Sequence, residues 1–123
     1  MSLVLIAVGG AVGAGARYLV DSWVSQLGTG AFPWGTLVVN LTGSFLLGLL
    51  FALATERGVL PADIRGPVMV GFIGAYTTFS TLMLETWRLG ESAGLAPALA
   101  NIVGSGILGL VAVGLGLAVG RMV

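Results

Sequence analysis

The charged residues of this chain are few and clustered, and the stretches between the clusters are long. The chain has 123 residues, and its uncharged runs cover residues 1–16, 22–55, 66–84 and 92–120. Only 8% of the residues are charged and the mean hydropathy is +1.07, whereas a soluble domain carries about 25% charged residues. Because a membrane-spanning helix needs roughly 20 mostly apolar residues, the pattern predicts an all-α integral membrane protein with four transmembrane helices.

Turn and stop signals predict where the four helices begin and end. Gly28-Thr29-Gly30 with Pro33 forms the first turn, and Pro61 follows the second helix. The expected helices span about Leu3–Val24, Trp34–Thr55, Pro67–Arg88 if the third is continuous, and a fourth with Pro97 in its first turns that ends at Gly120-Arg121. We expect them to form a single domain over residues 1–123.

The arginines show almost no preference for one side of the membrane. With four helices, the termini and the middle loop share the side that carries Arg57, Arg65 and Arg121, and the other side carries Arg17 and Arg88. Because an excess of Lys and Arg in cytoplasmic loops sets orientation, a chain with so small a bias can insert both ways round. A bundle of four helices is also too thin to enclose a path across the membrane by itself. We therefore expect an antiparallel, dual-topology homodimer.

The side-chain inventory argues against an enzyme. The chain has no Cys, His or Lys, and its acids are expected at or near helix ends. A proton-coupled exporter usually binds its proton at a carboxylate buried in the membrane. The sequence places no acidic residue in the central part of a predicted transmembrane helix. The net charge is zero, so no basic patch indicates a nucleic-acid partner.

Neutral hydrogen-bonding side chains recur on two helices. Thr36, Asn40 and Ser44 are four residues apart and share a face, as do Asn101 and Ser105. Hydroxyls and carboxamides can hold a small anion weakly enough to let it leave. Ser and Thr can instead bond to their own backbone, which is the ordinary role for Ser44. An unpaired buried amide costs about 1–3 kcal/mol, which favours a functional or interhelical role for Asn40.

The third helix carries a polar, weakly helical segment at membrane depth, Gly74-Ala75-Tyr76-Thr77-Thr78-Phe79-Ser80-Thr81. Hydrocarbon cannot satisfy its hydroxyls, so the segment must face protein or a water-filled path. Unwinding at Thr77-Thr78 would free backbone carbonyls, which are hard ligands for a cation such as Na⁺ or Ca²⁺. The lack of nearby carboxylates favours a monovalent ion. A single phenylalanine in a membrane helix usually faces lipid or the protein core. Among these hydroxyls, however, the positive edge of the Phe79 ring can contact an anion.

Arg17 lies four residues before Asp21, and this spacing has two interpretations. Arg17 is either an interfacial arginine with an i,i+4 partner or part of a vestibule that attracts anions. The sequence leaves both open.

Two glycine pairs at a spacing of four residues also have two interpretations. Gly9 with Gly13, and Gly116 with Gly120, allow membrane helices to touch backbone to backbone. The contact lies either within one subunit or between subunits.

Three motifs together resemble the Fluc/CrcB family of fluoride channels, and the match covers all four helices in order. They are Gly9-Gly10-Ala11-Val12-Gly13-Ala14-Gly15-Ala16-Arg17-Tyr18, Trp34-Gly35-Thr36-Leu37-Val38-Val39-Asn40-Leu41-Thr42-Gly43-Ser44-Phe45, and Gly71-Phe72-Ile73-Gly74-Ala75-Tyr76-Thr77-Thr78-Phe79-Ser80-Thr81. The resemblance implies an antiparallel homodimer with two fluoride pores. It also implies a structural Na⁺ at the dimer centre, held by the backbone carbonyls of Gly74 and Thr77.

The resemblance further implies roles for side chains. Arg17 falls on the family's helix-one arginine, and Glu85 lies where the family often has a glutamate near one vestibule. The residues that it implies for the anion path are Asn40, Thr36, Phe79, Ser80 and Thr81, with Asn101 and Ser105 on the fourth helix.

Two positions depart from the family pattern. Leu82 stands where the family usually repeats phenylalanine, and an aliphatic side chain lacks the positive edge of a ring. Asn101 stands where an aromatic residue is often found, and it could substitute as a hydrogen-bond donor.

These features predict a channel for passive, fluoride-selective efflux in the bacterial inner membrane, with the lipid bilayer and an antiparallel copy as partners. A small multidrug-type exporter is one alternative, but it needs a membrane-embedded acid in the first helix, and residues 1–16 have none. A non-conducting partner subunit of a heterodimeric channel is the other alternative.

Overall fold

The structure is a computed structural model that describes residues 2–123, and its regular elements are all helical. In chain order they are α1 (Leu3–Leu27), α2 (Trp34–Phe51), the π-helical turn η1 (Ala52–Glu56), α3 (Ala62–Arg65), the π-helical η2 (Gly66–Ile73), α4 (Gly74–Tyr76), α5 (Phe79–Ala93) and α6 (Leu95–Met122). They join into four stretches long and apolar enough to cross a membrane: Leu3–Leu27, Trp34–Glu56, Ala62–Ala93 and Leu95–Met122. The predicted all-α chain with four candidate transmembrane helices is confirmed.

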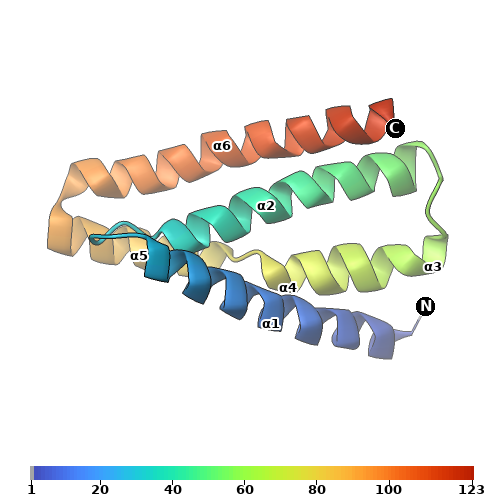
Figure 1. Cartoon of the computed structure of the whole chain (residues 1–123), viewed down its shortest axis with the longest axis horizontal. Coiled ribbons are helices and arrows are strands. Elements are labelled where there is room, and N and C mark those ends of the chain that lie inside the picture. Colours follow the sequence, from blue (N-terminus) through green and yellow to red (C-terminus); the bar gives the residue numbers. More distant parts are fainter. Residues whose placement is uncertain (1) are drawn as a thin grey trace.

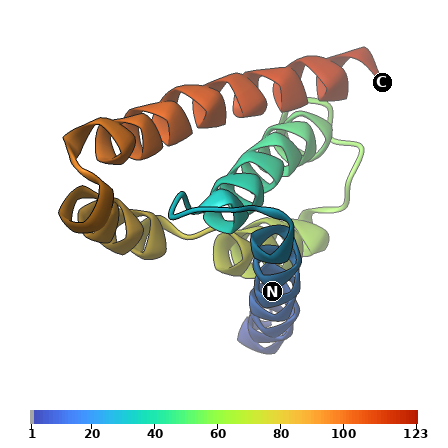
Figure 2. The ribbon, with the colours of Figure 1, turned by 60° about the vertical axis from the view of Figure 1, so that its left-hand side comes forward.

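The helices form an elongated bundle in which α2 lies between α6 and α1 (Figures 1 and 2). Both termini and the connection into α3 lie at one end, and the other two connections lie at the opposite end (Figure 1). α6 packs along α2 and also contacts α5, while α1 packs against η2, α4 and α2. The segment of residues 74–93, which contains α4 and α5, thereby contacts α1, α2 and α6.

Glycines allow the closest of these contacts. A Cβ atom at Gly9 or Gly13 on α1 would collide with the backbone of η2. A Cβ atom at Gly116 on α6 would collide with the backbone of α2, and one at Gly120 would approach the Cβ atom of Ala52 in η1 to 2.6 Å. Of the two interpretations of these glycine pairs, the structure supports packing within one subunit.

The first and last helices match the sequence prediction closely. α1 continues beyond the expected end at Val24 to Leu27, because no glycine or proline occurs between Val24 and Gly28. α6 has Pro97 in its first turn, as predicted, where the missing N–H of proline costs no helical hydrogen bond.

The third membrane segment differs more from the prediction. It begins at Ala62 rather than at Pro67, because the chain accommodates Pro67 inside the wider π-helical η2. It also continues past Arg88 to Ala93, where Gly94 ends the helix with a φ of 102°.

The predicted break in this segment is present between α4 and α5. Thr77 has φ −81° and ψ 158°, and Thr78 has φ −150° and ψ 114°. Both residues are therefore extended, and the ribbon narrows to a coil between the two helices (Figures 1 and 2).

Candidate ion-binding site at the helix break

Asn40 on α2 pairs with the backbone at the break. Its Oδ1 accepts a hydrogen bond from the Thr78 N–H at 2.8 Å, and its Nδ2 donates to the Thr78 carbonyl oxygen at 3.1 Å. The carboxamide acts like a peptide group of a neighbouring strand, so Thr78 keeps both backbone hydrogen bonds outside a helix. This pairing is the interhelical role considered for Asn40. Nδ2 carries a second hydrogen, which these two bonds leave available to another acceptor.

The break also redirects the donors of two carbonyl groups. In an uninterrupted helix, the N–H groups of Thr78 and Thr81 would donate to the carbonyls of Gly74 and Thr77. Here the Thr78 N–H donates to Asn40, and the Thr81 N–H donates to Thr78 Oγ1 at 3.3 Å. The Gly74 and Thr77 carbonyls thus lose their helical donors. Gly74 is exposed, and a Cβ atom there would meet nothing within 4 Å among the described residues, which leaves room for a ligand.

Thr78 begins α5 as its N-cap. Its Oγ1 accepts from the Thr81 N–H and also donates to Thr81 Oγ1 at 3.0 Å. A side-chain oxygen in this position satisfies a backbone donor that has no helical partner. The N-terminal end of α5, with its partial positive charge, therefore lies at Phe79 and Ser80, beside the break.

A cleft of about 220 Å³ lies on the α1 side of Thr78. Its walls bring together three of the predicted residues, Arg17, Thr36 and Thr81, with Ala14, Tyr18, Asp21 and Val39. Within residues 2–123, no ion pair joins Arg17 to Asp21. Asp21 Oδ1 instead accepts from Ser25 Oγ at 3.3 Å. Arg17 therefore has no i,i+4 ion pair among the described residues, and it lines the cleft.

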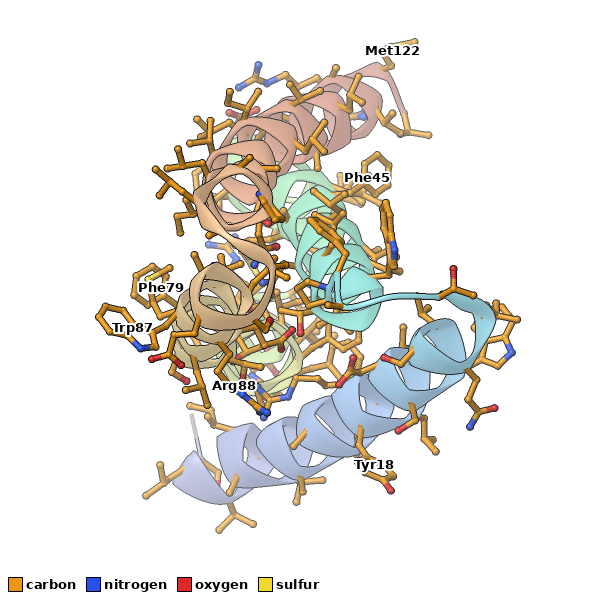
Figure 3. All side chains as sticks on the ribbon, turned by 90° about the vertical axis from the view of Figure 1, so that its left-hand side faces the viewer. Tyr18, Phe45, Phe79, Trp87, Arg88 and Met122 are labelled. Atoms are coloured by element: carbon orange, nitrogen blue, oxygen red, sulfur yellow. The ribbon has the colours of Figure 1, made fainter. Side chains whose placement is uncertain are left out.

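A second cleft, of about 240 Å³, lies on the other side of Thr78 between α2 and α5. It is lined by Asn40, Gly43, Ser44, Leu47, Thr77, Thr78, Phe79 and Leu82. Phe79 is 74% exposed, and its ring projects from α5 away from the neighbouring helices, as does that of Trp87 (Figure 3). Asn40, Phe79 and Leu82 therefore line one cleft, and most of the Phe79 ring is exposed.

Glu85 is bonded to Thr36 in the wall of the first cleft and itself lines a larger cleft beside the start of α2 and the second half of α5. The hydroxyl of Thr36, which is 3% exposed, donates to Glu85 Oε1 at 2.5 Å. Half-buried Glu85 also lines a cleft of about 510 Å³ with Ala31, Pro33, Arg88, Leu89, Glu91 and Ser92. With its proton directed at Glu85, Thr36 offers only lone pairs to the first cleft, so it donates to an anion only when Glu85 releases it.

Asn101 and Ser105 lie inside the chain rather than at these clefts. They are 1% and 8% exposed. Asn101 Nδ2 donates to Thr86 Oγ1 at 2.9 Å, and the Thr86 hydroxyl donates to the Leu82 carbonyl oxygen at 2.7 Å. Within residues 2–123, Asn101 Oδ1 and Ser105 Oγ have no hydrogen-bond partner.

Ser80 and Gly74 are exposed and line neither cleft beside Thr78. The structure therefore gathers Arg17, Thr36 and Thr81 on one side of Thr78, and Asn40, Thr77 and Phe79 on the other.

Residues 4–117 match the family described as CrcB-like protein, Camphor Resistance (CrcB). The chain belongs to the CrcB-like family. It is 50% identical over 121 residues to the fluoride-specific ion channel FluC of Hahella chejuensis, covering 98% of this chain and 95% of that protein. It is 48% identical over 123 residues to FluC of Magnetococcus marinus, with all of both chains covered. It is 52% identical over 107 residues to FluC 2 of Mycobacterium bovis, covering 87% and 81% of the two chains.

Membership of the CrcB-like family confirms the resemblance seen in the sequence and decides against the small multidrug-type exporter. The relatives named above are ion channels rather than enzymes, in agreement with the side-chain inventory. In this CrcB-like chain, two hydroxyl contacts were not anticipated from the sequence. Thr86 holds Asn101, and Thr42 Oγ1 lies 2.8 Å from the Tyr76 hydroxyl oxygen. From the sequence, a threonine in a membrane helix is expected to bond only to its own backbone. The sequence therefore did not indicate that Thr86 binds Asn101 or that Thr42 binds Tyr76.

Proposed function

We propose that this CrcB-like protein is a fluoride-selective channel that lets fluoride leave the cytoplasm passively through the inner membrane. The observation that carries the proposal is identity of about half of all residues, over nearly the whole chain, to proteins named fluoride-specific ion channels. The four apolar helices are consistent with a multi-pass membrane channel.

For the anion path, we assign the two clefts that adjoin Thr78. Arg17 and the N-terminal end of α5 supply positive potential. The second hydrogen of Asn40 Nδ2, the Thr81 hydroxyl and the edge of the Phe79 ring can each contact an anion without neutralising it. Ser80, Asn101 and Ser105 extend the proposed path, and Glu85 with Thr36 stands at its vestibule. Neutral donors of this kind bind fluoride weakly enough to allow conduction.

We propose that the channel is an antiparallel, dual-topology homodimer. Most of the surface of α1 and α6 is exposed in the single chain, and Phe79, which lines one of the clefts beside Thr78, is 74% exposed. A second copy would cover part of this surface and close the clefts. The balanced arginine distribution supports insertion in both orientations.

We further propose a structural Na⁺ at the centre of this dimer. The residues fit such an ion, because the break releases the Gly74 and Thr77 carbonyls from helical donors and leaves open space beside Gly74. Carbonyl oxygens from unwound membrane helices are suitable Na⁺ ligands. When bound, Na⁺ would supply a fixed positive charge that holds the broken segments of two copies together.

Efflux from liposomes tests the function. Purified protein reconstituted with internal fluoride should release it within seconds to minutes after the addition of a K⁺ ionophore, without ATP or a proton gradient, as measured with a fluoride electrode. Protein-free liposomes are the control. Equal chloride efflux would contradict selectivity, and a requirement for a proton gradient would contradict passive conduction.

The same experiment separates the homodimer from the remaining alternative. A non-conducting partner subunit would release no fluoride when reconstituted alone, and efflux would appear only with a second, different chain. Efflux from this chain alone would exclude that alternative.

A further inference from the structure

Tyr76, the last residue of α4, is anchored to α2 through its hydroxyl. The ring is 6% exposed, and its hydroxyl oxygen lies 2.8 Å from Thr42 Oγ1. Thr42 Oγ1 also donates to the Val38 carbonyl oxygen at 2.7 Å. Because the single hydroxyl hydrogen of Thr42 is used there, Tyr76 is the donor and Thr42 the acceptor.

The Tyr76 ring also lies against Phe72 and Gly43. It stacks on Phe72, with ring centroids 5.8 Å apart and an interplanar angle of 7°. Gly43 on α2 lies against it, since a Cβ atom there would reach Tyr76 Cδ1 at 3.1 Å and collide with the methyl group of Thr77. α2 can approach α4 this closely only because Gly43 has no side chain.

α2 therefore holds the break from both sides. Asn40 binds the backbone of Thr78, and Thr42 binds the side chain of Tyr76, so that only Thr77 lies between the two attachments. Without the Tyr76 attachment, the end of α4 could rotate about its axis, and the carbonyls of Gly74 and Thr77 would turn with it.

We propose that Tyr76 and Thr42 are positioning residues that fix the direction of the Gly74 and Thr77 carbonyls. This inference rests on the proposed function, which assigns those carbonyls to Na⁺. Neither side chain contacts the ion. Both act by restricting the backbone that does.

The test measures how Na⁺ raises the thermal unfolding midpoint of the full-length protein in detergent. Tyr76→Phe removes only the hydroxyl, and it should raise the Na⁺ concentration for half-maximal stabilisation by about five- to tenfold, as expected for one lost hydrogen bond. Thr42→Val should give a similar shift, and the double variant should be no worse than either single one, because both changes remove the same bond. Thr42→Ser keeps the acceptor and should behave like the unaltered protein.

Hydrogen exchange of the peptide containing Thr77 and Thr78 provides a second readout at fixed Na⁺. The Thr78 amide, which donates to Asn40, should exchange faster in Tyr76→Phe. Phe72→Leu is the matched control: it alters the stacking partner and keeps the hydroxyl bond, so it should leave the half-saturating Na⁺ concentration unchanged.

The outcomes are distinct. An equal loss of thermal stability with and without Na⁺, at an unchanged half-saturating concentration and unchanged exchange, would make the pair merely structural and overturn the inference. An unaltered protein that does not respond to Na⁺ would remove the Na⁺ assignment, and this inference with it.

Discussion

Asn40 satisfies the backbone of the break and also offers a donor to the proposed anion path. Removing its carboxamide leaves the Thr78 N–H and carbonyl without partners, at a cost of about 1–3 kcal/mol for each buried group. Asn40→Ala should therefore lower the unfolding midpoint and reduce fluoride efflux by at least about tenfold in protein that still folds.

Ser44→Ala is the matched control for Asn40. Ser44 lies one turn further along α2 and lines the same cleft, whereas the backbone of Thr78 is bound by Asn40. The Ser44 substitution should leave efflux within about twofold, since one weak hydrogen bond at most is lost. Equal losses in both variants would contradict the special role of Asn40.

Leu82 offers a gain-of-function prediction at the same scale. It lines the cleft beside Phe79, where a ring would add a positive edge facing the proposed anion path. Leu82→Phe should raise fluoride efflux by roughly two- to tenfold, the factor expected for an aromatic contact of about 0.5–1.5 kcal/mol. Leu82→Met supplies similar bulk without that edge and should have little effect. A rise with methionine would show that volume, rather than the ring edge, matters at this position.

At the scale of elements, the sequence was sufficient where one local signal dominated. Uncharged runs located the four spans, and the Gly74–Thr81 segment located the break. The start of the third segment was missed because Pro67 is accommodated by a π-helical turn, which depends on how the surrounding helices pack. The sequence also could not indicate whether Asn101 and Ser105 face a cleft or the interior, because a polar residue has the same sequence signal whether it faces a cleft or a buried hydroxyl such as Thr86.

The contact between α6 and α2 gives a prediction for elements. A Cβ atom at Gly116 would collide with the Phe45 carbonyl oxygen, whereas one at Gly114, on the same helix, meets nothing within 4 Å among the described residues. Gly116→Ala should therefore destabilise the protein by about 1–3 kcal/mol through overpacking, seen as a lower unfolding midpoint. Gly114→Ala should be neutral or slightly stabilising, because alanine favours helix. A loss of stability at Gly114 would instead mean that a neighbouring chain packs there.

At the scale of the whole molecule, the end that holds both chain termini is closed by ionic contacts. Arg121 binds Glu56 through two hydrogen bonds of 2.8 and 2.7 Å, and Arg57 donates to the Gly120 carbonyl oxygen at 3.3 Å. The Arg121 and Glu56 side chains are 56% and 33% exposed, and a pair this accessible adds little to stability. The pair has a larger effect on geometry, because it holds the C-terminal end of α6 beside η1, which follows α2. The charged side chains at this end are therefore fixed to the helix bundle.

Charge at that end should therefore control both the orientation of the chain in the membrane and the formation of the antiparallel dimer. The arginine count differs by only one between the two sides of the chain, so a C-terminal reporter should be found on both faces of the membrane.

Adding three lysines after Val123 should retain that end in the cytoplasm. The tagged chain expressed alone would then lack antiparallel partners, and fluoride resistance of the host should fall towards that of cells without the channel. Co-expression with a copy biased the opposite way, by added lysines in the loop between α1 and α2, should restore resistance. A single orientation of the untagged chain, or full resistance from one biased copy alone, would rule out the antiparallel dimer.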